Sequence, residues 1–197
     1  MFTTYLEKWK QIPKSVKFFL FKALALLFIW KTIYLVFLLP TRVLDAPSTY
    51  SVGVATAYSL NLLYNTNNYS SKKEIALVNS EFGPVHVNQQ AIYLNDKKVV
   101  AIEDACNGLE LFILYAGFII CLPAFWLRKV AFISIGLVLI YLINIFRCTL
   151  ITWVLLNHAN LFGFVHHYLF TFIVYVFIIV LWLLFTRKLT PNYATEQ

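Results

Sequence analysis

Four long apolar runs, separated by polar and basic residues, dominate the pattern of the chain. They cover about residues 18–39, 109–127, 130–156 and 164–185. Each run is close to the ~20 residues that a helix needs to cross the hydrocarbon core of a bilayer. The pattern therefore predicts four transmembrane helices, the first of which ends at Pro40.

The longest polar stretch, residues 41–104, lies between the first and second apolar runs. Within it, residues 46–64 have the composition of an amphipathic helix at the membrane interface. Residues 85–102 have the composition of strands, and Asn95-Asp96 is a plausible hairpin turn. We therefore expect an all-α polytopic membrane protein that carries this outer helix and a short β-hairpin.

Composition supports a membrane protein and argues against a soluble one. The 197 residues are 60% hydrophobic, 18% aromatic and 13% charged, with a mean hydropathy of +0.72. A soluble domain has too little interior to bury so much apolar area. We therefore treat residues 1–197 as a single membrane-embedded domain.

The formal net charge is +7, but the basic residues stand at the ends of the apolar runs rather than in one patch. This distribution follows the positive-inside rule and gives no reason to expect nucleic-acid binding. It places both termini in the cytoplasm, together with Arg128-Lys129 and Arg187-Lys188. The first run also resembles a signal peptide, but no A-x-A site follows, so we expect an uncleaved anchor.

Three polar groups from different segments then fall at one membrane depth. At a rise of about 1.5 Å per residue, Cys106 lies ~33 Å from Arg128, Arg147 ~27 Å from Lys129, and His166 ~32 Å from Arg187. The hydrocarbon core is ~30 Å thick. All three are therefore expected at the outer boundary of the membrane.

These residue types suit nucleophilic catalysis at the outer face. A helix N-terminus and a nearby cation lower the pKa of a thiol, which favours the nucleophilic thiolate of Cys106. His166 is placed to act as a general base, and Arg147 to stabilise an oxyanion or a substrate carboxylate. The neighbouring His167 is an alternative base.

Several neighbours are expected to support this site. Gly108 permits close backbone approach, and Asn144 lies one turn before Arg147 on the same helical face. The acidic residues Glu103, Asp104 and Glu110 are candidate partners for Arg147.

Structural interpretations compete with these roles. A single cysteine at a helix end is commonly structural, and Arg147 paired with Glu110 would simply hold helices together. His166 and His167 are adjacent, and no H-x-x-x-H or C-x-x-C is present, so no metal and no cofactor are expected.

At this point three short motifs resemble the exosortase/archaeosortase family. "EDACNGLELF" is similar to its cysteine motif, "NIFR" to its N-x-x-R motif and "FVHH" to its final histidine motif. The chain looks most like the compact exosortase-like proteins of Bacteroidetes-type bacteria. The sequence departs from the family pattern at Asn107 and Glu110, where serine and a basic residue are usual, and at His167, where aspartate is common.

The resemblance implies a membrane-embedded cysteine peptidase or transpeptidase with Cys106 as nucleophile. Its partners would be membrane lipid and proteins that carry a C-terminal sorting signal, made of a short motif, a hydrophobic helix and a basic tail. It implies a bacterial inner-membrane location with the site facing the periplasm. A non-enzymatic assembly or transport subunit and a membrane acyltransferase remain as alternatives.

Overall fold

The structure is a computed structural model, which describes residues 13–80 and 83–187 of the chain. In chain order the described elements are α2 (Lys14–Ile33), the π-helix η1 (Tyr34–Leu38), α3 (Leu39–Thr41), α4 (Asp45–Tyr64), β1 (Tyr69–Ser80), β2 (Gly83–Leu94), β3 (Lys97–Glu103), the 3-10 helix η2 (Asp104–Cys106), α5 (Leu109–Cys121), α6 (Trp126–Asn157), the 3-10 helix η3 (Ala159–Leu161), α7 (Phe162–Phe164), the π-helix η4 (Val165–Leu169) and α8 (Phe170–Arg187).

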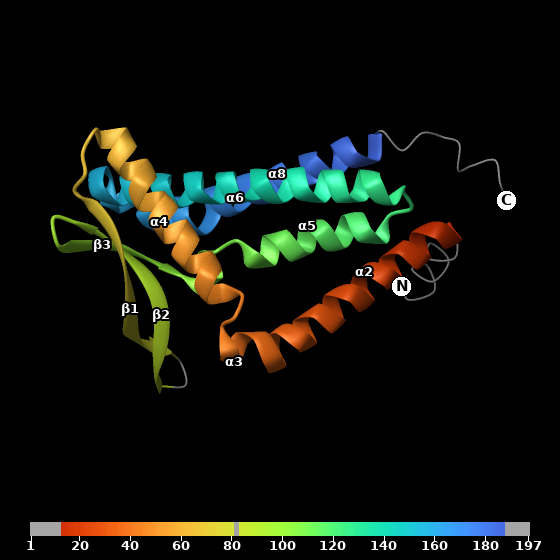
Figure 1. The fold of residues 1–197 in the computed structure, drawn as a ribbon, viewed down its shortest axis with the longest axis horizontal. Coiled ribbons are helices and arrows are strands. Elements are labelled where there is room, and N and C mark those ends of the chain that lie inside the picture. The colour runs from red at the N-terminus through yellow and green to blue at the C-terminus, as the bar shows by residue number, and fades with distance from the viewer. Residues whose placement is uncertain (1–12, 81–82, 188–197) are drawn as a thin grey trace, which may run out of the picture.

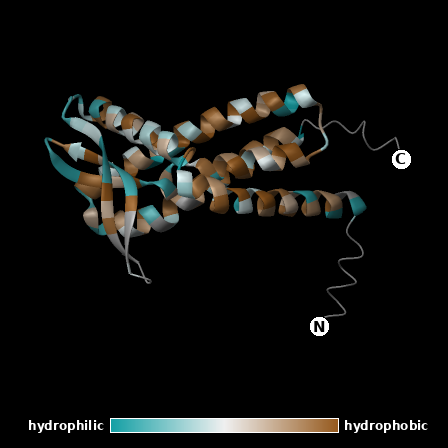
Figure 2. Ribbon diagram, turned by 60° about the horizontal axis from the view of Figure 1, so that its bottom comes forward, coloured by the Kyte–Doolittle hydropathy of each residue, from teal (hydrophilic) through white to brown (hydrophobic). Residues whose placement is uncertain are grey.

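The long helices α2, α5, α6 and α8 extend along the long axis of the molecule, and the sheet lies at one end (Figure 1). Apolar residues cover these helices, whereas hydrophilic residues concentrate in the sheet and at helix ends (Figure 2). Many apolar side chains of α2 are exposed, including Phe21, Leu24 and Phe28. Such a surface suits contact with lipid rather than water.

Two helical stretches among the described residues are long and apolar enough to cross a membrane. They are Val16–Thr41, with 26 residues, and Trp126–Asn157, with 32 residues. Two further apolar helices, Leu109–Cys121 and Phe172–Arg187, are shorter. The structure therefore supports two of the four expected crossings, and the other two stay a prediction.

The second apolar run ends earlier than expected. Helix α5 stops at Cys121 because Leu122 is extended and precedes Pro123, which disfavours helical backbone at the preceding residue. Helix α6 then begins at Trp126, so Arg128 and Lys129 lie in its first turn instead of between two helices. Lys129 donates to the carbonyl of Ile120 at 2.8 Å, which satisfies an acceptor near the end of α5.

The polar segment between the first two runs folds as one helix and three strands. Helix α4 covers the expected range, and its buried face includes Val52, Thr56 and Leu60. The expected hairpin is present as β2 and β3, and Asn95 and Asp96 both have positive φ, as a tight two-residue turn requires. The additional strand β1 pairs antiparallel with β2 and was not expected.

Three apolar clusters are found among the described residues, one of which joins α6 to η4 and the start of α8 through Ile151, Val165 and Phe170. A second joins α4, the sheet and α6, and its buried members include Leu60, Ile92 and Cys148. The third lies inside the helix bundle and includes Tyr115, Ile140 and Ile178. The loop that carries Cys106 connects the sheet to the bundle and contacts the second cluster.

Candidate active site around Cys106

The cysteine lies in a short connection between the sheet and the helix bundle. Strand β3 ends at Glu103, the 3-10 turn η2 ends at Cys106, and α5 begins at Leu109. Gly108 has a φ of 83°, a conformation that costs a side-chain-bearing residue about 1–2 kcal/mol. This turn redirects the chain from the sheet into the bundle directly after the thiol.

Asp104 anchors the front of this loop to the segment before α4. Arg42 donates from Nε at 2.8 Å and from Nη2 at 2.7 Å to the two carboxylate oxygens, and Thr49 adds a third hydrogen bond at 2.7 Å. Both charged side chains are about one-fifth exposed. A bidentate pair of this kind fixes orientation as well as position.

Asn107 anchors the other side of the thiol. Its amide donates to Asp45 at 2.9 Å and to Thr49 at 3.3 Å, and its Oδ1 accepts the backbone N–H of Leu109 at 2.8 Å. Tyr34 in turn donates to Asp45 at 3.0 Å. Cys106 therefore lies between two residues that are both tied to the start of α4.

Helix α6 supplies the contacts to Cys106 itself. The buried amide of Asn144 donates to the Cys106 carbonyl at 3.0 Å. One turn later, Nη2 of Arg147 lies 3.9 Å from Sγ of Cys106. Among the described residues, the buried Nε of Arg147 has no hydrogen-bond acceptor. A buried donor without an acceptor is uncommon in folded proteins.

His166 completes the group from a third segment. Cys106, Arg147 and His166 line one small cavity of about 50 Å³, whose other walls come from residues 100–102, from α6 and from Phe162. His166 lies in the π-helix η4, and its ring stacks on Phe162 with centroids 5.4 Å apart. Single π-turns inside helices occur frequently at functional sites. The side chain of His167 lies outside the described part of the structure.

Burial, more than the nearby cation, sets the acidity of the thiol. Burial raises the pKa of Cys106, the Arg147 guanidinium lowers it, and Glu103 raises it, with a net upward direction. The net direction is opposite to the expected lowering, although the contribution of the cation has the expected sign. A thiol with a raised pKa needs a base before it can attack.

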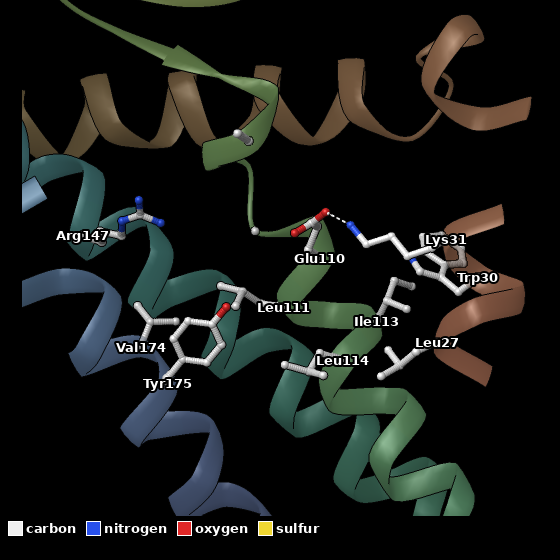
Figure 3. A pocket seen from close by; sticks show the side chains of 12 residues that line it. Leu27, Trp30, Lys31, Glu110, Leu111, Ile113, Leu114, Arg147, Val174 and Tyr175 are labelled. Atoms are coloured by element: carbon white, nitrogen blue, oxygen red, sulfur yellow. Dashed lines mark hydrogen bonds and ion pairs between the residues drawn. The ribbon is translucent and has the colours of Figure 1, made fainter. Parts of the chain in front are cut away.

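The acidic residues do not pair with Arg147 as expected. Asp104 binds Arg42, and Glu110 forms an exposed ion pair with Lys31 of α2. Figure 3 shows this pair beside a cavity of about 370 Å³, with Arg147 pointing into the same space from α6. Arg147 therefore borders both this cavity and the smaller one, and the predicted structural pair of Arg147 with Glu110 is not formed.

The anchors on the α4 side were not identified from the sequence. Arg42, Asp45 and Thr49 all contact the cysteine loop although they lie 55 to 62 residues away in the chain. Arg42 follows the first apolar run, on the side of the membrane where Asp104 is also expected. A single cation at this position is the feature of the sequence that could have indicated the pair. Among residues 13–80 and 83–187, no three His, Cys, Asp or Glu side chains gather in a metal-binding group.

Comparison with known proteins gives one match. A family model described as transmembrane exosortase (Exosortase_EpsH) matches residues 15–189, which is most of the chain. No curated protein and no solved structure matches significantly.

Proposed function

Because this chain belongs to the transmembrane exosortase family, we propose that it is a membrane-embedded cysteine peptidase or transpeptidase. It cleaves a C-terminal sorting signal of surface or secreted proteins near the outer membrane face. One observation carries the proposal: Cys106, Arg147 and His166, from three separate segments, line the same cavity.

In the proposed reaction His166 removes the proton of the Cys106 thiol, and the thiolate attacks the scissile carbonyl carbon. Arg147 stabilises the oxyanion, since its Nη2 lies 3.9 Å from the sulfur that attacks the carbonyl. The C–N bond then breaks, and the amine leaves with the proton from the imidazolium. A thioester on Cys106 remains, which an acceptor amine or water resolves.

The raised pKa of the thiol fits a base-dependent nucleophile. A cysteine that is already ionised in the resting state needs no proton acceptor, whereas burial keeps Cys106 protonated until a base removes the proton. His167 is adjacent in η4 and is the alternative base.

The proposed location is the inner membrane of a bacterium, with four crossings and both termini in the cytoplasm. The sheet, α4 and the Cys106 loop then lie together on the periplasmic side, at one end of the long helices (Figure 1). Substrate proteins would present the cleavage motif there while their hydrophobic helix stays in the bilayer.

The test is processing of a tailed substrate in cells that carry variants of this chain. Cys106→Ala and Cys106→Ser are expected to leave the substrate uncut while the variant protein still accumulates in the membrane. Cys121→Ala is the matched control, since Cys121 lies at the far end of α5, and processing should continue. Uncut substrate in the control, or cleavage by Cys106→Ala, would refute the assignment.

The mass of the product separates the alternatives. Loss of the C-terminal tail supports a peptidase, and gain of an acyl group without cleavage supports an acyltransferase. An unchanged substrate mass in cells with the wild-type chain would favour an assembly or transport subunit.

A further inference from the structure

Strand β3 lies at the edge of the three-stranded sheet. The strand order is β1-β2-β3, and β3 pairs with β2 on one side only. Among the described residues no strand pairs with its other side. An unpaired edge presents backbone N–H and C=O groups that can accept a further strand.

The cavity that holds Cys106 runs along this open edge. It is lined by three successive residues of β3, Val100, Ala101 and Ile102. Val100 and Ile102 lie on the face of the strand that packs against the cluster containing Cys148. Because successive side chains of a strand point to opposite faces, the contact of Ala101 with the same cavity indicates that the cavity also reaches the backbone of β3.

The other walls of the cavity come from Cys148, Ile151 and Thr152 of α6 and from Phe162 and His166. The candidate nucleophile and the candidate base therefore line the same small space as β3.

The strand also leads directly to the nucleophile. Beyond Glu103, the last residue of β3, the single turn η2 brings Cys106 to the same cavity, and Asp104 holds this turn against Arg42 and Thr49. The spacing between the open edge and the sulfur is therefore fixed by the fold.

We propose that the extended segment of a protein substrate pairs through its backbone with the open edge of β3, as a fourth strand that presents its scissile carbonyl to Cys106. This inference rests on the proposed function. Main-chain hydrogen bonds supply affinity in such strand addition, and side-chain pockets add selectivity.

A peptide with a thiol-reactive group tests the pairing on the wild-type chain in detergent. Acetyl-Ala-Ala-Ala-chloromethyl ketone alkylates a thiolate by displacement of chloride, and chloroacetone carries the same reactive group without the peptide. Modification of Cys106 is followed by mass spectrometry of its proteolytic peptide. We expect the tripeptide to react at least ~10-fold faster than chloroacetone, since backbone pairing raises its local concentration.

N-methylation of the probe gives a change in reaction rate that depends on strand pairing alone. Alternate residues of an added strand direct their N–H toward β3, so methylation at alternate positions should remove the gain and methylation between them should not. Equal effects at all three positions, or no effect, would overturn the proposal. If both probes react at the same rate, the proposal of strand pairing is refuted while Cys106 can still be the nucleophile. If neither probe modifies Cys106, its assignment as the nucleophile is refuted as well.

A pair of proline variants tests the enzyme side. Ala101→Pro removes a backbone donor at the β3 edge, and Ile75→Pro does so in β1, at the opposite edge of the sheet, where alternate residues from Tyr69 onward direct their N–H away from β2. The gain of the tripeptide over chloroacetone should disappear in the first variant and persist in the second. If the Ala101→Pro protein folds and the tripeptide still reacts faster than chloroacetone, the proposal is contradicted. If this variant does not fold, the N-methylated probes on the wild-type chain decide whether the proposal holds.

Discussion

Removal of the positive charge of Arg147 is expected to suppress the reactivity of Cys106. In Arg147→Gln the guanidinium that lies 3.9 Å from Sγ is replaced by a neutral amide of similar shape. Two unit charges about 4 Å apart interact by about 4 kcal/mol at an effective dielectric constant of ~20. This attraction favours the thiolate over the neutral thiol, and the amide of glutamine does not supply it.

The sign follows from which form the cation stabilises. Arg147 favours the thiolate, so its removal raises the pKa of Cys106 further above a value that burial has already raised. At a pH below both pKa values the thiolate fraction then falls. A more basic thiolate is also a better nucleophile, with a Brønsted slope of ~0.4–0.5, so an energy of about 4 kcal/mol corresponds to a net loss in rate of up to roughly 60-fold.

The assay is the rate of modification of Cys106 by a membrane-impermeant methanethiosulfonate as a function of pH, read by mass spectrometry of the proteolytic peptide. Two control variants test whether the loss of charge at this position causes the slower modification. Arg147→Lys keeps the charge and should retain much of the rate. Lys129→Gln removes a charge ~27 Å away on the same helix, by the rise of about 1.5 Å per residue, and should change nothing. An unchanged pH profile in Arg147→Gln would refute the electrostatic argument.

Two further predictions concern the anchoring of the cysteine loop. Asp104→Asn weakens a bidentate pair with Arg42 that is about one-fifth exposed, and should lower stability by ~2 kcal/mol, or ~4–8 °C in a thermal melt in detergent. Asp96→Asn breaks a pair whose carboxylate is 90% exposed and should shift the melt by less than half as much; equal shifts would show that burial is irrelevant. Gly108→Ala places a Cβ at a φ of 83° and 3.3 Å from the amide that binds the Cys106 carbonyl, so thiol modification should slow and stability fall by ~1–2 kcal/mol. Gly163→Ala, with no atom within 4 Å of the added Cβ, is the control, and a similar effect there would contradict the explanation.

Local features of the sequence were enough to predict much of the architecture. The apolar runs indicated membrane helices because about 20 successive apolar residues have few other uses. The turn at Asn95-Asp96 was predicted because few residues other than glycine tolerate two successive positive φ angles. A shared depth of Cys106, Arg147 and His166 was expected from the constant rise of a helix. That rise does not hold throughout the count from Cys106 to Arg128, because α5 covers only Leu109–Cys121.

Partner choice, in contrast, depends on how helices rotate about their axes and on which distant segments meet. Arg147 and Glu110 were predicted to pair, yet Glu110 faces Lys31 across α2 and α5, and Asp104 is held by Arg42. Strand β1 pairs with β2 along its whole length, although no strand was predicted for these residues. These outcomes are set by long-range contacts, which local periodicity does not encode.

The sequence by itself thus determined the class of the protein and its apolar helices. Only the tertiary structure decided that Cys106, Arg147 and His166 share one cavity with residues of β3, and that the thiol is buried enough for its pKa to rise. The physical reason is that depth and periodicity are properties of one segment, whereas burial, electrostatic environment and free edges are created only when several segments pack together.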